Sequence, residues 1–248
     1  MKKVSTSYII EQYQSGVPNY KKSTLEVGLW DSEKYVFTQY LQKSDKILDM
    51  GCGTGRTTFP LYATGYQNVK GLDLTPEMIE AAQELNAHFG VDIPFEVADA
   101  RELDFEEGAF DAVIFSFNGL MSIPDMKERE KALKEIARVL KRGGVFIFTT
   151  HDRENDPLYF DFWKEEEKKW AEGEQRTDLY EFGDIISFSK NEIGRIFIHI
   201  PIQSEVEDFV QKAGFEVVET FYRPDKFDEP QKVKDKSGEC RFWVVRKK

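Results

Sequence analysis

Cysteine, histidine and long apolar runs are all scarce in this sequence of 248 residues. Its two cysteines, Cys52 and Cys240, are too few and too far apart for a disulfide framework or a zinc cluster, and they suit a reducing compartment. The three histidines add no metal-ligand spacing, so we expect no metal. No run approaches about 18 apolar residues, and no apolar segment follows Met1-Lys2-Lys3. We therefore expect no membrane span, no secretory signal and a cytoplasmic protein.

Positive charge is also in short supply. Lysine and arginine number 34 against 45 aspartate and glutamate residues, so the net charge is −11. Nucleic-acid binding depends on clustered basic residues that neutralise phosphates, so we expect no nucleic-acid partner. Aromatic residues make up 14% of the chain, which is too many for a disordered one, and the length suits one sizeable α/β domain. We expect a monomer or a homodimer.

Short apolar runs alternate with helical segments between residues 46 and 150. The runs predict five strands at Ile47–Met50, Val69–Leu74, Ile93–Ala98, Phe110–Phe117 and Val145–Thr149. Between them, Thr75 begins one helix, and Asp125 begins another that ends at Gly143. The fourth run is apolar almost throughout, as in strands that are buried on both faces. This alternation of strands and helices predicts right-handed crossovers and a parallel sheet.

Two flanking parts have a different pattern. Residues 1–44 predict two helices that are separated by a break at 16–19. Residues 151–202 form an insertion, which begins with a charged helix at about 158–170 and continues as a β-hairpin. The predicted arms of the hairpin are Ile185–Phe188 and Arg195–Ile200, with the turn near 191–194.

The C-terminal part completes the predicted sheet. Residues 203–213 predict a helix that Gly214 ends, and Phe215–Phe221 and Arg241–Arg246 predict two closing strands. The charged stretch Arg223–Glu239 between these strands predicts an exposed loop.

A glycine-rich turn, Gly51-Cys52-Gly53-Thr54-Gly55, follows the first strand. Asp49 precedes it, and Asp73 and Asp99 end or follow the next two strands, at intervals of 24 and 26 residues. Ligands of parallel sheets bind at the carboxyl ends of the strands, so the three carboxylates converge on one site. There Asp73 can accept hydrogen bonds from two ribose hydroxyls, and Asp99 from an exocyclic amine such as that of adenine.

The turn departs from a dinucleotide-binding turn. Such a turn has glycine at its first, third and sixth positions, whereas here the sixth position is Arg56 and the glycines are first, third and fifth. Asp49 would also lie close to a pyrophosphate and repel it. A nucleoside without phosphates, carrying an amino acid and a positively charged sulfur, suits the turn better. A tight turn with no ligand is the alternative.

Together these segments resemble the Rossmann-like class I S-adenosylmethionine-dependent methyltransferases. Ile47–Gly55 is similar to the first motif of that family, Asp73 to its ribose-binding acid, and Asp99-Ala100 to its adenine-contacting position. Phe110–Val113 and Leu140–Gly144 are similar to the family's entry into strand four and to its turn before strand five.

The resemblance implies a fold and a domain plan. It covers about residues 40–150 and the closing elements from 203 onward. In the family the sheet has seven strands, mostly parallel with the last one antiparallel, and helices cover both faces. Residues 45–248 would form this domain, with 151–202 as a substrate-side insertion, and residues 1–44 would form a helical lid. In the family such variable parts hold the substrate.

The resemblance also implies contacts to S-adenosylmethionine as cofactor. The turn backbone would line its methionine part, Asp49 would help to place the amino group, and Leu74 would pack on adenine. The end of strand four would lie near the sulfonium, where backbone carbonyls can make weak C–H···O contacts to the methyl group. The implied cofactor-binding residues are Asp49, Gly51, Cys52, Gly53, Gly55, Asp73, Leu74, Asp99, Ala100, Phe115 and Ser116.

Methyl transfer from a sulfonium is an in-line displacement, for which good positioning is worth about 7–11 kcal/mol. A general base is needed only when the acceptor arrives protonated. His151 directly follows strand five and is the candidate base. The structural alternative for this histidine is a hydrogen bond to the backbone at the strand end.

Five further residues are candidates for substrate contact. Arg195 and His199 share one face of the predicted hairpin, which is otherwise a solvent-facing surface. Asn118 follows the fourth strand, where it can orient an acceptor or simply form a turn. Tyr20 and Trp30 can close the cofactor pocket or pack as ordinary core aromatics.

The class of acceptor follows by elimination. After strand four the chain has Phe115-Ser116-Phe117-Asn118, so it lacks the Asn/Asp-Pro-Pro-aromatic motif of enzymes that methylate adenine or glutamine amino groups. Pro124 is followed by Asp125 and not by the cysteine of cytosine-C5 enzymes. We expect methyl transfer to oxygen, nitrogen or carbon of a small-molecule substrate. The alternatives are a relative that binds the cofactor without methylating, and a nicotinamide-dependent oxidoreductase.

Overall fold

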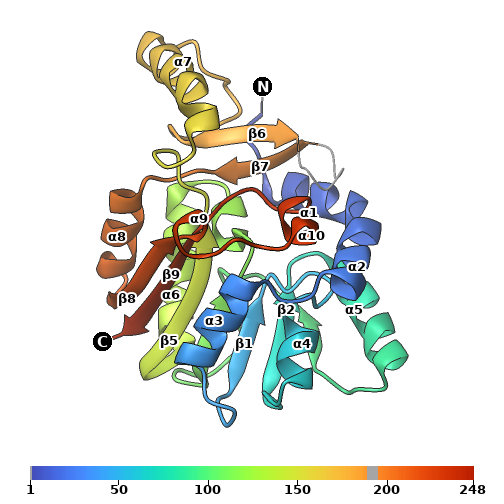
Figure 1. The fold of residues 1–248 in the computed structure, drawn as a ribbon. Helices are drawn as coiled ribbons and strands as arrows, with labels where there is room; N and C mark the ends of the chain where they lie inside the picture. Colours follow the sequence, from blue (N-terminus) through green and yellow to red (C-terminus); the bar gives the residue numbers. More distant parts are fainter. Residues whose placement is uncertain (1, 189–194) are drawn as a thin grey trace.

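The computed structural model describes residues 2–188 and 195–248, so the expected hairpin turn at 191–194 lies outside the described residues. Seven strands form one sheet in the order β3-β2-β1-β4-β5-β9-β8 (Figure 1). Their bounds are Ile47–Met50 (β1), Val69–Asp73 (β2), Phe95–Val97 (β3), Phe110–Phe115 (β4), Leu140–Thr150 (β5), Phe215–Tyr222 (β8) and Arg241–Lys247 (β9). The first five pair in parallel, and β9 runs antiparallel to both β5 and β8. The predicted sheet with an antiparallel last strand is confirmed.

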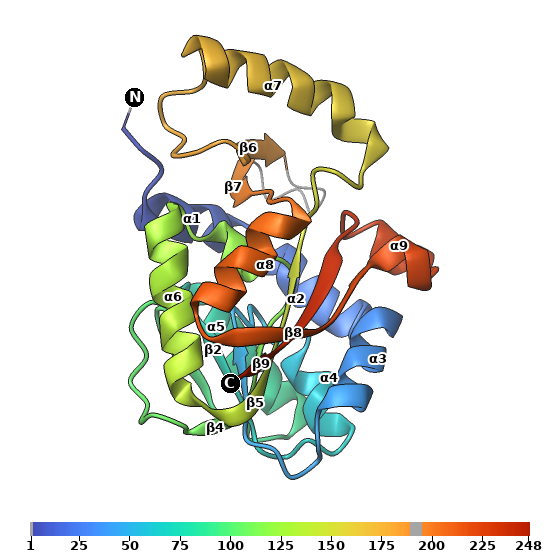
Figure 2. The same cartoon turned by 90° about the vertical axis from the view of Figure 1, so that its left-hand side faces the viewer.

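Helices cover both faces of the sheet, because successive strand residues point to opposite sides. Ile47 packs in one apolar cluster with helices α3 (Asp31–Tyr40), α4 (Thr58–Ala63) and α5 (Pro76–Phe89). Leu48, the next residue, packs in a second cluster with α6 (Met126–Val139) and α8 (Gln203–Lys212). Figure 2 shows α6 and α8 on one side of the sheet and α3 and α4 on the other. In the part of the chain that the structure describes, no helix is both long and apolar enough to cross a bilayer.

The predicted turn after α6 is a bulge within β5. The strand begins at Leu140, directly after the helix, and its register against β4 shifts before Val145. The four residues between, which the sequence predicts as the end of the helix, are looped out of the ladder. Gly144 allows this path, because a Cβ there would lie 2.8 Å from the carbonyl oxygen of Lys141.

The N-terminal part holds three helices, and the prediction of two is wrong. Helices α1 (Thr6–Ser15) and α2 (Val17–Glu26) are separated by Gly16 alone. Pro18 lies in the first turn of α2, where its missing N–H breaks no helical hydrogen bond. The predicted break is therefore a bend between two helices. The third helix, α3, packs on the sheet in the first apolar cluster.

The insertion forms a helix and a hairpin that stand apart from the large sheet (Figures 1 and 2). Helix α7 (Phe160–Glu172) follows the 3₁₀ turn η2 (Pro157–Tyr159). Strand β6 (Asp184–Phe188) pairs antiparallel with β7 (Arg195–His199) in a separate two-stranded sheet. The predicted helix and hairpin are confirmed.

The insertion shares a small apolar cluster with the N-terminus. The buried members of this cluster are Val4, Ile9, Leu179 and Phe197. It is separate from the two clusters that sandwich the sheet. The backbone joins the same segments, since the Val4 N–H donates to the Asp178 carbonyl oxygen at 3.0 Å. We call residues 2–15, together with the described residues of 160–199, the cap.

The stretch between β8 and β9 is exposed at many of its positions, as predicted, but buried side chains such as Arg223, Glu229 and Val233 anchor it to the protein. It contains two short helices, α9 (Arg223–Lys226) and α10 (Gln231–Lys234). The Arg223 side chain is fully buried and donates to Glu239 and to the Gly238 carbonyl oxygen. Its charge is paired within the segment, which is why a charged sequence can be buried here.

Candidate cofactor site

A cavity lies at the carboxyl ends of β1, β2 and β4, where ligands of parallel sheets bind. It encloses about 1130 Å³, including the part that is open to solvent. The glycine turn, the ends of β2 and β3, the loop after β4, and helices α1 and α2 line it. The predicted residues in its wall are Tyr20, Gly51, Cys52, Gly53, Asp73, Leu74, Asp99, Ala100, Phe115 and Ser116.

The turn needs glycine where it faces the cavity. Gly51 and Gly53 have φ values of 58° and 55°, in the left-handed region that favours glycine. A Cβ at Gly51 would lie 2.6 Å from the Phe115 ring, so a ligand meets bare backbone here. Burial raises the pKa of the Cys52 thiol well above its usual range. Cys52 is therefore a small side chain within the turn and not a thiolate nucleophile.

Two of the predicted cofactor residues do not line the cavity. A Cβ at Gly55 would lie 2.6 Å from the Phe59 ring and 3.2 Å from that of Phe95, so this glycine serves the packing of the turn. The Asp49 carboxylate is buried in β1 and accepts a hydrogen bond of 2.7 Å from the Thr58 hydroxyl. Burial raises the pKa of Asp49 to about 7. In contrast to the expectation, neither the Asp49 side chain nor Gly55 lines the cavity.

Asp73 ends β2 and fastens the glycine turn. One carboxylate oxygen accepts from the Gly53 N–H at 2.9 Å, and the other accepts from the Thr75 N–H at 2.8 Å. Burial raises the pKa of Asp73, and these N–H donors oppose the rise. Each carboxylate oxygen has a further lone pair, so this cavity residue can also accept from ribose hydroxyls.

Asp99 is held by Arg101, two residues along the chain. The arginine Nε lies 2.9 and 3.0 Å from the two carboxylate oxygens, and Nη2 lies 2.6 Å from one of them. Burial alone would raise the pKa of Asp99, but the hydrogen bonds and the charge of Arg101 hold it below its usual value. The carboxylate is thus ionised and can accept from an adenine amino group.

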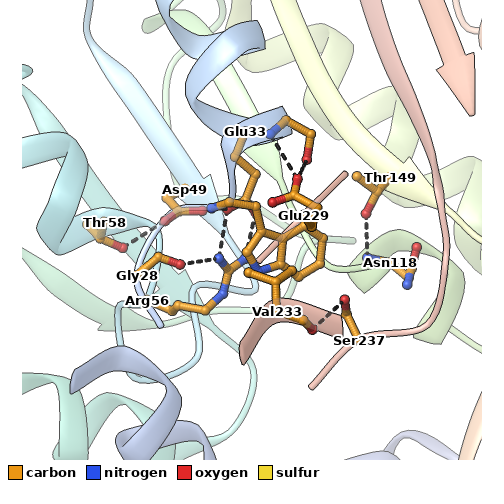
Figure 3. Close-up of polar contacts among 12 residues, drawn as sticks. Gly28, Glu33, Asp49, Arg56, Thr58, Asn118, Thr149, Glu229, Val233 and Ser237 are labelled. Atoms are coloured by element: carbon orange, nitrogen blue, oxygen red, sulfur yellow. Dashed lines mark hydrogen bonds and ion pairs between the residues drawn. The ribbon is translucent and has the colours of Figure 1, made fainter. Parts of the chain in front are cut away.

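A buried charge cluster supports the glycine turn (Figure 3). Arg56 donates to both oxygens of Glu33, at 2.7 and 2.6 Å, and to the Gly28 carbonyl oxygen. The Trp30 ring lies 4.8 Å from the Arg56 guanidinium and 4.8 Å from that of Arg223. We expected Trp30 to line the cavity, and it does not. Arg56, whose guanidinium packs on the Trp30 ring, does line it.

The C-terminal segment anchors this cluster. The Glu229 carboxylate accepts from the backbone N–H groups of Asp31 and Ser32, at 3.0 and 2.9 Å, at the start of α3. Figure 3 shows Glu229 beside Glu33 and Arg56. Negative charge at the first turn of a helix is favourable, so this contact fixes α3 beside the site.

His151 and Asn118 form a hydrogen-bonded pair beyond the ends of β5 and β4. His151 Nδ1 lies 2.7 Å from the Glu239 carbonyl oxygen, which can only accept, so Nδ1 carries the proton of the neutral ring. His151 Nε2 lies 3.2 Å from Asn118 Nδ2. Phe117 and Asn118 have φ values of 56° and 63°, and the Asn118 N–H donates to the Thr149 hydroxyl. Such strained turns cluster at functional sites. Phe117 lines the cavity, but the two paired side chains do not.

The predicted hairpin face does not meet the cavity. His199 is buried, with Nδ1 at 2.8 Å from Asp184, and Phe197 belongs to the apolar cluster of the cap. Arg195 is exposed at the start of β7. This face packs on the N-terminal segment, so it offers no substrate-binding surface in the cavity.

Within the described residues, Glu181, Asp184 and His199 bring three possible metal ligands within 4.8 Å of one another. Glu181 already pairs with Arg129 of α6, and Asp184 accepts from the backbone N–H groups of Tyr180 and Glu181 as well as pairing with His199. The positive Arg129 opposes a cation here, so these three residues form a polar contact between the cap and the sheet domain. By sheet domain we mean the seven-stranded sheet with the helices packed on its two faces.

Several cavity residues were missed from the sequence, among them Thr6, Tyr13, Arg101 and Ser122. The Tyr13 hydroxyl lies 2.8 Å from that of Ser122, although the two residues are far apart in the chain. Arg101 alone carried a usable signal, because it is a cation two residues after an acid predicted to bind ligand. The others meet only through the packing of distant segments.

The fold and the cavity define a Rossmann-like protein whose glycine turn and strand-end acids suit an adenosine-bearing ligand. A family model described as a methyltransferase domain matches residues 47–144. The structure of a SAM-dependent methyltransferase from Methanosarcina mazei is similar, with a TM-score of 0.70 and 22% identity over 89% of this chain and 99% of that one.

Curated relatives extend the comparison. An uncharacterized protein of Methanocaldococcus jannaschii is 31% identical over 86% of this chain and 78% of its own length. Ajmaline N-methyltransferase of Rauvolfia serpentina is 31% identical over 44% of this chain and 37% of its own length. The eEF1A lysine and N-terminal methyltransferase of Danio rerio is 28% identical over 52% of this chain, which spans only 19% of that protein.

Residues 47–144 therefore form a methyltransferase domain, the chain has the fold of the S-adenosylmethionine-dependent methyltransferases, and S-adenosylmethionine is its cofactor. The cavity fits this cofactor, because Gly51 and Gly53 leave its floor free of side chains, and Asp73 and Asp99 present acceptors. The family match gives no support to the nicotinamide alternative.

Proposed function

We propose that this enzyme methylates a small, partly apolar molecule at oxygen, nitrogen or carbon. The observation that carries the proposal is the cavity wall formed by α1 and α2. The Tyr20 ring lies close enough to the glycine turn that a Cβ on Gly53 would be 3.7 Å from it. Tyr13 lines the same wall. Helices so near the turn favour a small acceptor over a polymer that needs an open groove.

The charges in the cavity wall support an acceptor with little charge of its own. Arg56 is paired with Glu33, Arg101 with Asp99, and Asp73 with two backbone N–H groups. An ionised acceptor would have to compete with these partners, whereas an aromatic or aliphatic one can pack on Tyr13 and Tyr20.

The residues of the chain act mainly by positioning. The backbone at Gly51 and Gly53 would hold the amino-acid part of the cofactor, Asp73 the ribose and Asp99 the adenine. The Asp49 side chain does not line the cavity, so it would affect the cofactor amino group only indirectly, from its position beside the turn. Bound S-adenosylmethionine supplies a methyl group on a positively charged sulfur. Holding an acceptor in line with that methyl is worth about 7–11 kcal/mol.

For an acceptor that arrives protonated, we assign the base to His151. Its Nε2 is the unprotonated nitrogen of the neutral ring, since Nδ1 faces the Glu239 carbonyl, and it would have to exchange its contact with Asn118 for one with the acceptor. Replacing His151→Gln should then lower kcat by about 10²–10⁴-fold and flatten its rise with pH. His88→Gln, on the surface helix α5, is the control. An unchanged kcat and pH profile would mean that transfer needs no base at this position.

The acceptor class is tested with a panel of phenols, amines and carboxylic acids, together with RNA and protein. Release of S-adenosylhomocysteine is measured for each. Turnover on uncharged aromatic or aliphatic members supports the proposal, and turnover on RNA or protein alone refutes it. A relative that binds the cofactor without methylating would bind S-adenosylhomocysteine in calorimetry and turn over no acceptor. Stronger binding of NADH would restore the nicotinamide alternative.

A further inference from the structure

The Arg101 guanidinium donates hydrogen bonds to three other residues. Its Nε and Nη2 donate to the Asp99 carboxylate, Nη1 donates to Glu128 at 2.7 Å, and Nη2 also reaches the Thr6 hydroxyl at 3.1 Å. One guanidinium thereby connects three elements, namely the segment after β3, helix α6 and the first residue of α1. Asp99, Arg101 and Thr6 all line the cavity.

The contact with Asp99 fixes the plane of its carboxylate. Both oxygens accept from the guanidinium, and one of them also accepts from the Arg101 backbone N–H at 2.9 Å. A planar fork of this kind permits one orientation of the carboxylate, which a lysine ammonium would not impose. The remaining lone pairs of Asp99 are those turned away from the guanidinium, so Arg101 decides where a ligand donor can bind.

The contact with Thr6 joins this carboxylate to the cap. Thr6 begins α1, whose Ile9 belongs to the apolar cluster shared with the insertion. Thr6 and Arg101 are 95 residues apart in the chain, and their hydrogen bond links the start of the cap to the side of the cavity that holds Asp99. A change in the position of the Arg101 side chain therefore reaches both Asp99 and the first turn of α1.

We propose that Arg101 is a positioning residue that aims the Asp99 carboxylate at the adenine amino group and couples adenine binding to the seating of helix α1. The inference rests on the proposed function, because it requires the adenosine part of the cofactor at Asp99. Adenine that donates to Asp99 stabilises the orientation set by Arg101, and this same orientation keeps the guanidinium within reach of Thr6. The cap then closes over a cofactor that bears a 6-amino purine and less well over any other.

The first test compares two ligands by calorimetry. S-adenosylhomocysteine carries the 6-amino group, and S-inosylhomocysteine carries a carbonyl oxygen in its place, which faces the Asp99 carboxylate as a second acceptor. The native enzyme should bind the first about 10–100-fold more tightly, as a charge-assisted hydrogen bond predicts. In Arg101→Gln, and in Arg101→Lys, this ratio should fall to about threefold or less, because the carboxylate is no longer held in one plane.

The second test follows hydrogen exchange of residues 6–15. S-adenosylhomocysteine should slow this exchange in the native enzyme and leave it unchanged in Arg101→Gln. Thr6→Val is the matched control, because it removes the hydroxyl at nearly constant shape. It should keep the ligand ratio and lose the protection of α1. If Arg101 had only a structural role, Arg101→Gln would leave the ratio of the two ligands and the ligand's protection of α1 unchanged.

The outcomes separate this inference from the function on which it rests. If the native enzyme binds no S-adenosylhomocysteine, both fail. If it binds that ligand and Arg101→Gln keeps the full preference over S-inosylhomocysteine, the positioning role is wrong and the proposed function stands. If the ratio falls but the ligand still slows exchange of α1 in Arg101→Gln and in Thr6→Val as much as in the native enzyme, the coupling to the cap is overturned.

Discussion

The sheet domain and the cap are held together by different kinds of contact. The sheet domain has an apolar cluster on each face of its sheet, and its buried members include Phe146, Phe148 and Trp243. The cap has one small cluster of its own with four buried members, and its Ile198 joins the cluster on the α6 side of the sheet. Burial of apolar surface is the dominant favourable contribution to folding, so the two parts differ in what fixes their positions. The sheet domain can hold a rigid cofactor site, while the smaller cluster of the cap fixes its position less firmly.

Besides the apolar contact of Ile198, polar contacts join the cap and the neighbouring helix α2 to the sheet domain. Gln14 donates to Glu77 at 2.6 Å, and Tyr13 meets Ser122 at 2.8 Å. Lys21 of α2 pairs with Glu84 at 2.6 Å on the surface. Contacts of this kind each contribute little net free energy, because water competes for the same groups. The difference between the parts is therefore testable by single substitutions.

The largest expected effect separates the two apolar clusters. Phe148 is fully buried in the sheet domain, and Phe197 is 1% exposed in the cap. Phe148→Ala should lower the free energy of unfolding by about 3–5 kcal/mol, as for other buried phenylalanines. Phe197→Ala should lower it by less than about 1 kcal/mol, because we expect the cap, with its small cluster, to open at a lower free energy than the domain below it. Urea denaturation followed by circular dichroism measures both.

Hydrogen exchange completes this comparison. Phe197→Ala should speed exchange in residues 160–188 and leave β1 and β4 unaffected, whereas Phe148→Ala should speed it throughout. Equal losses of stability in the two variants would show that cap and sheet domain unfold as one unit, contrary to our view of them.

The next effect concerns the cofactor site of the sheet domain. Asp73→Ala should weaken binding of S-adenosylhomocysteine by about 1–3 kcal/mol, because the ribose hydroxyls lose a charged acceptor. Glu96→Ala is the control, since this exposed acid of β3 pairs with Lys70 and lies outside the cavity. Calorimetric titration gives both dissociation constants. An unchanged constant for Asp73→Ala would contradict the assignment to ribose.

The sequence was informative where one element decides the geometry. Short apolar runs that alternate with helices of one apolar face predict the parallel strands, and Asp73 follows from its place at a strand end. It was less informative within a strand that is buried on both sides. Every residue of β1 is buried, so nothing in the pattern tells that the Asp49 carboxylate turns to Thr58 and not to the cavity.

Contacts between distant segments could not be predicted from the sequence at all. Tyr13 and Ser122 are 109 residues apart, and Glu229 meets Asp31 across 198 residues. The stretch around Arg223 has the composition of an exposed loop, yet the side chain is buried because its partners lie in the same segment. Local propensity carries no information on such pairings, and tertiary packing decides them.

A further effect, on pH dependence, tests the buried carboxylate of β1. The pKa of Asp49 is raised from about 3.8 to about 7 by burial, so the folded protein holds a proton that the unfolded chain has released. Its contribution to stability is fully present below pH 3.8 and is lost as the pH rises to about 7, at about 1.4 kcal/mol per pH unit. Asp49→Asn should remove this slope between pH 5 and 7.

The control for the slope is an acid whose pKa is shifted the other way. Burial alone would raise the pKa of Asp111, but its hydrogen bond to Lys141 and the Lys46 N–H hold it low. Asp111→Asn should leave the loss of stability between pH 5 and 7 in place, and its own effect should emerge only in more acidic solution. Thermal unfolding across pH 4–8 measures all three proteins. Parallel curves for the native protein and Asp49→Asn would mean that Asp49 stays ionised in the fold.

The smallest expected effect lies on the polar side of the comparison. Lys21 and Glu84 are exposed by 38% and 68%, so their ion pair at 2.6 Å competes with water and salt. Lys21→Met should cost about 0.5 kcal/mol or less in urea denaturation, and the cost should vanish at high salt. A double-mutant cycle with Glu84→Gln isolates the pair from other effects of the methionine. A coupling energy above about 1 kcal/mol would show that this ion pair strongly stabilises the contact between α2 and α5. The attachment of the N-terminal helices would then depend on single charges instead of on many weak contacts.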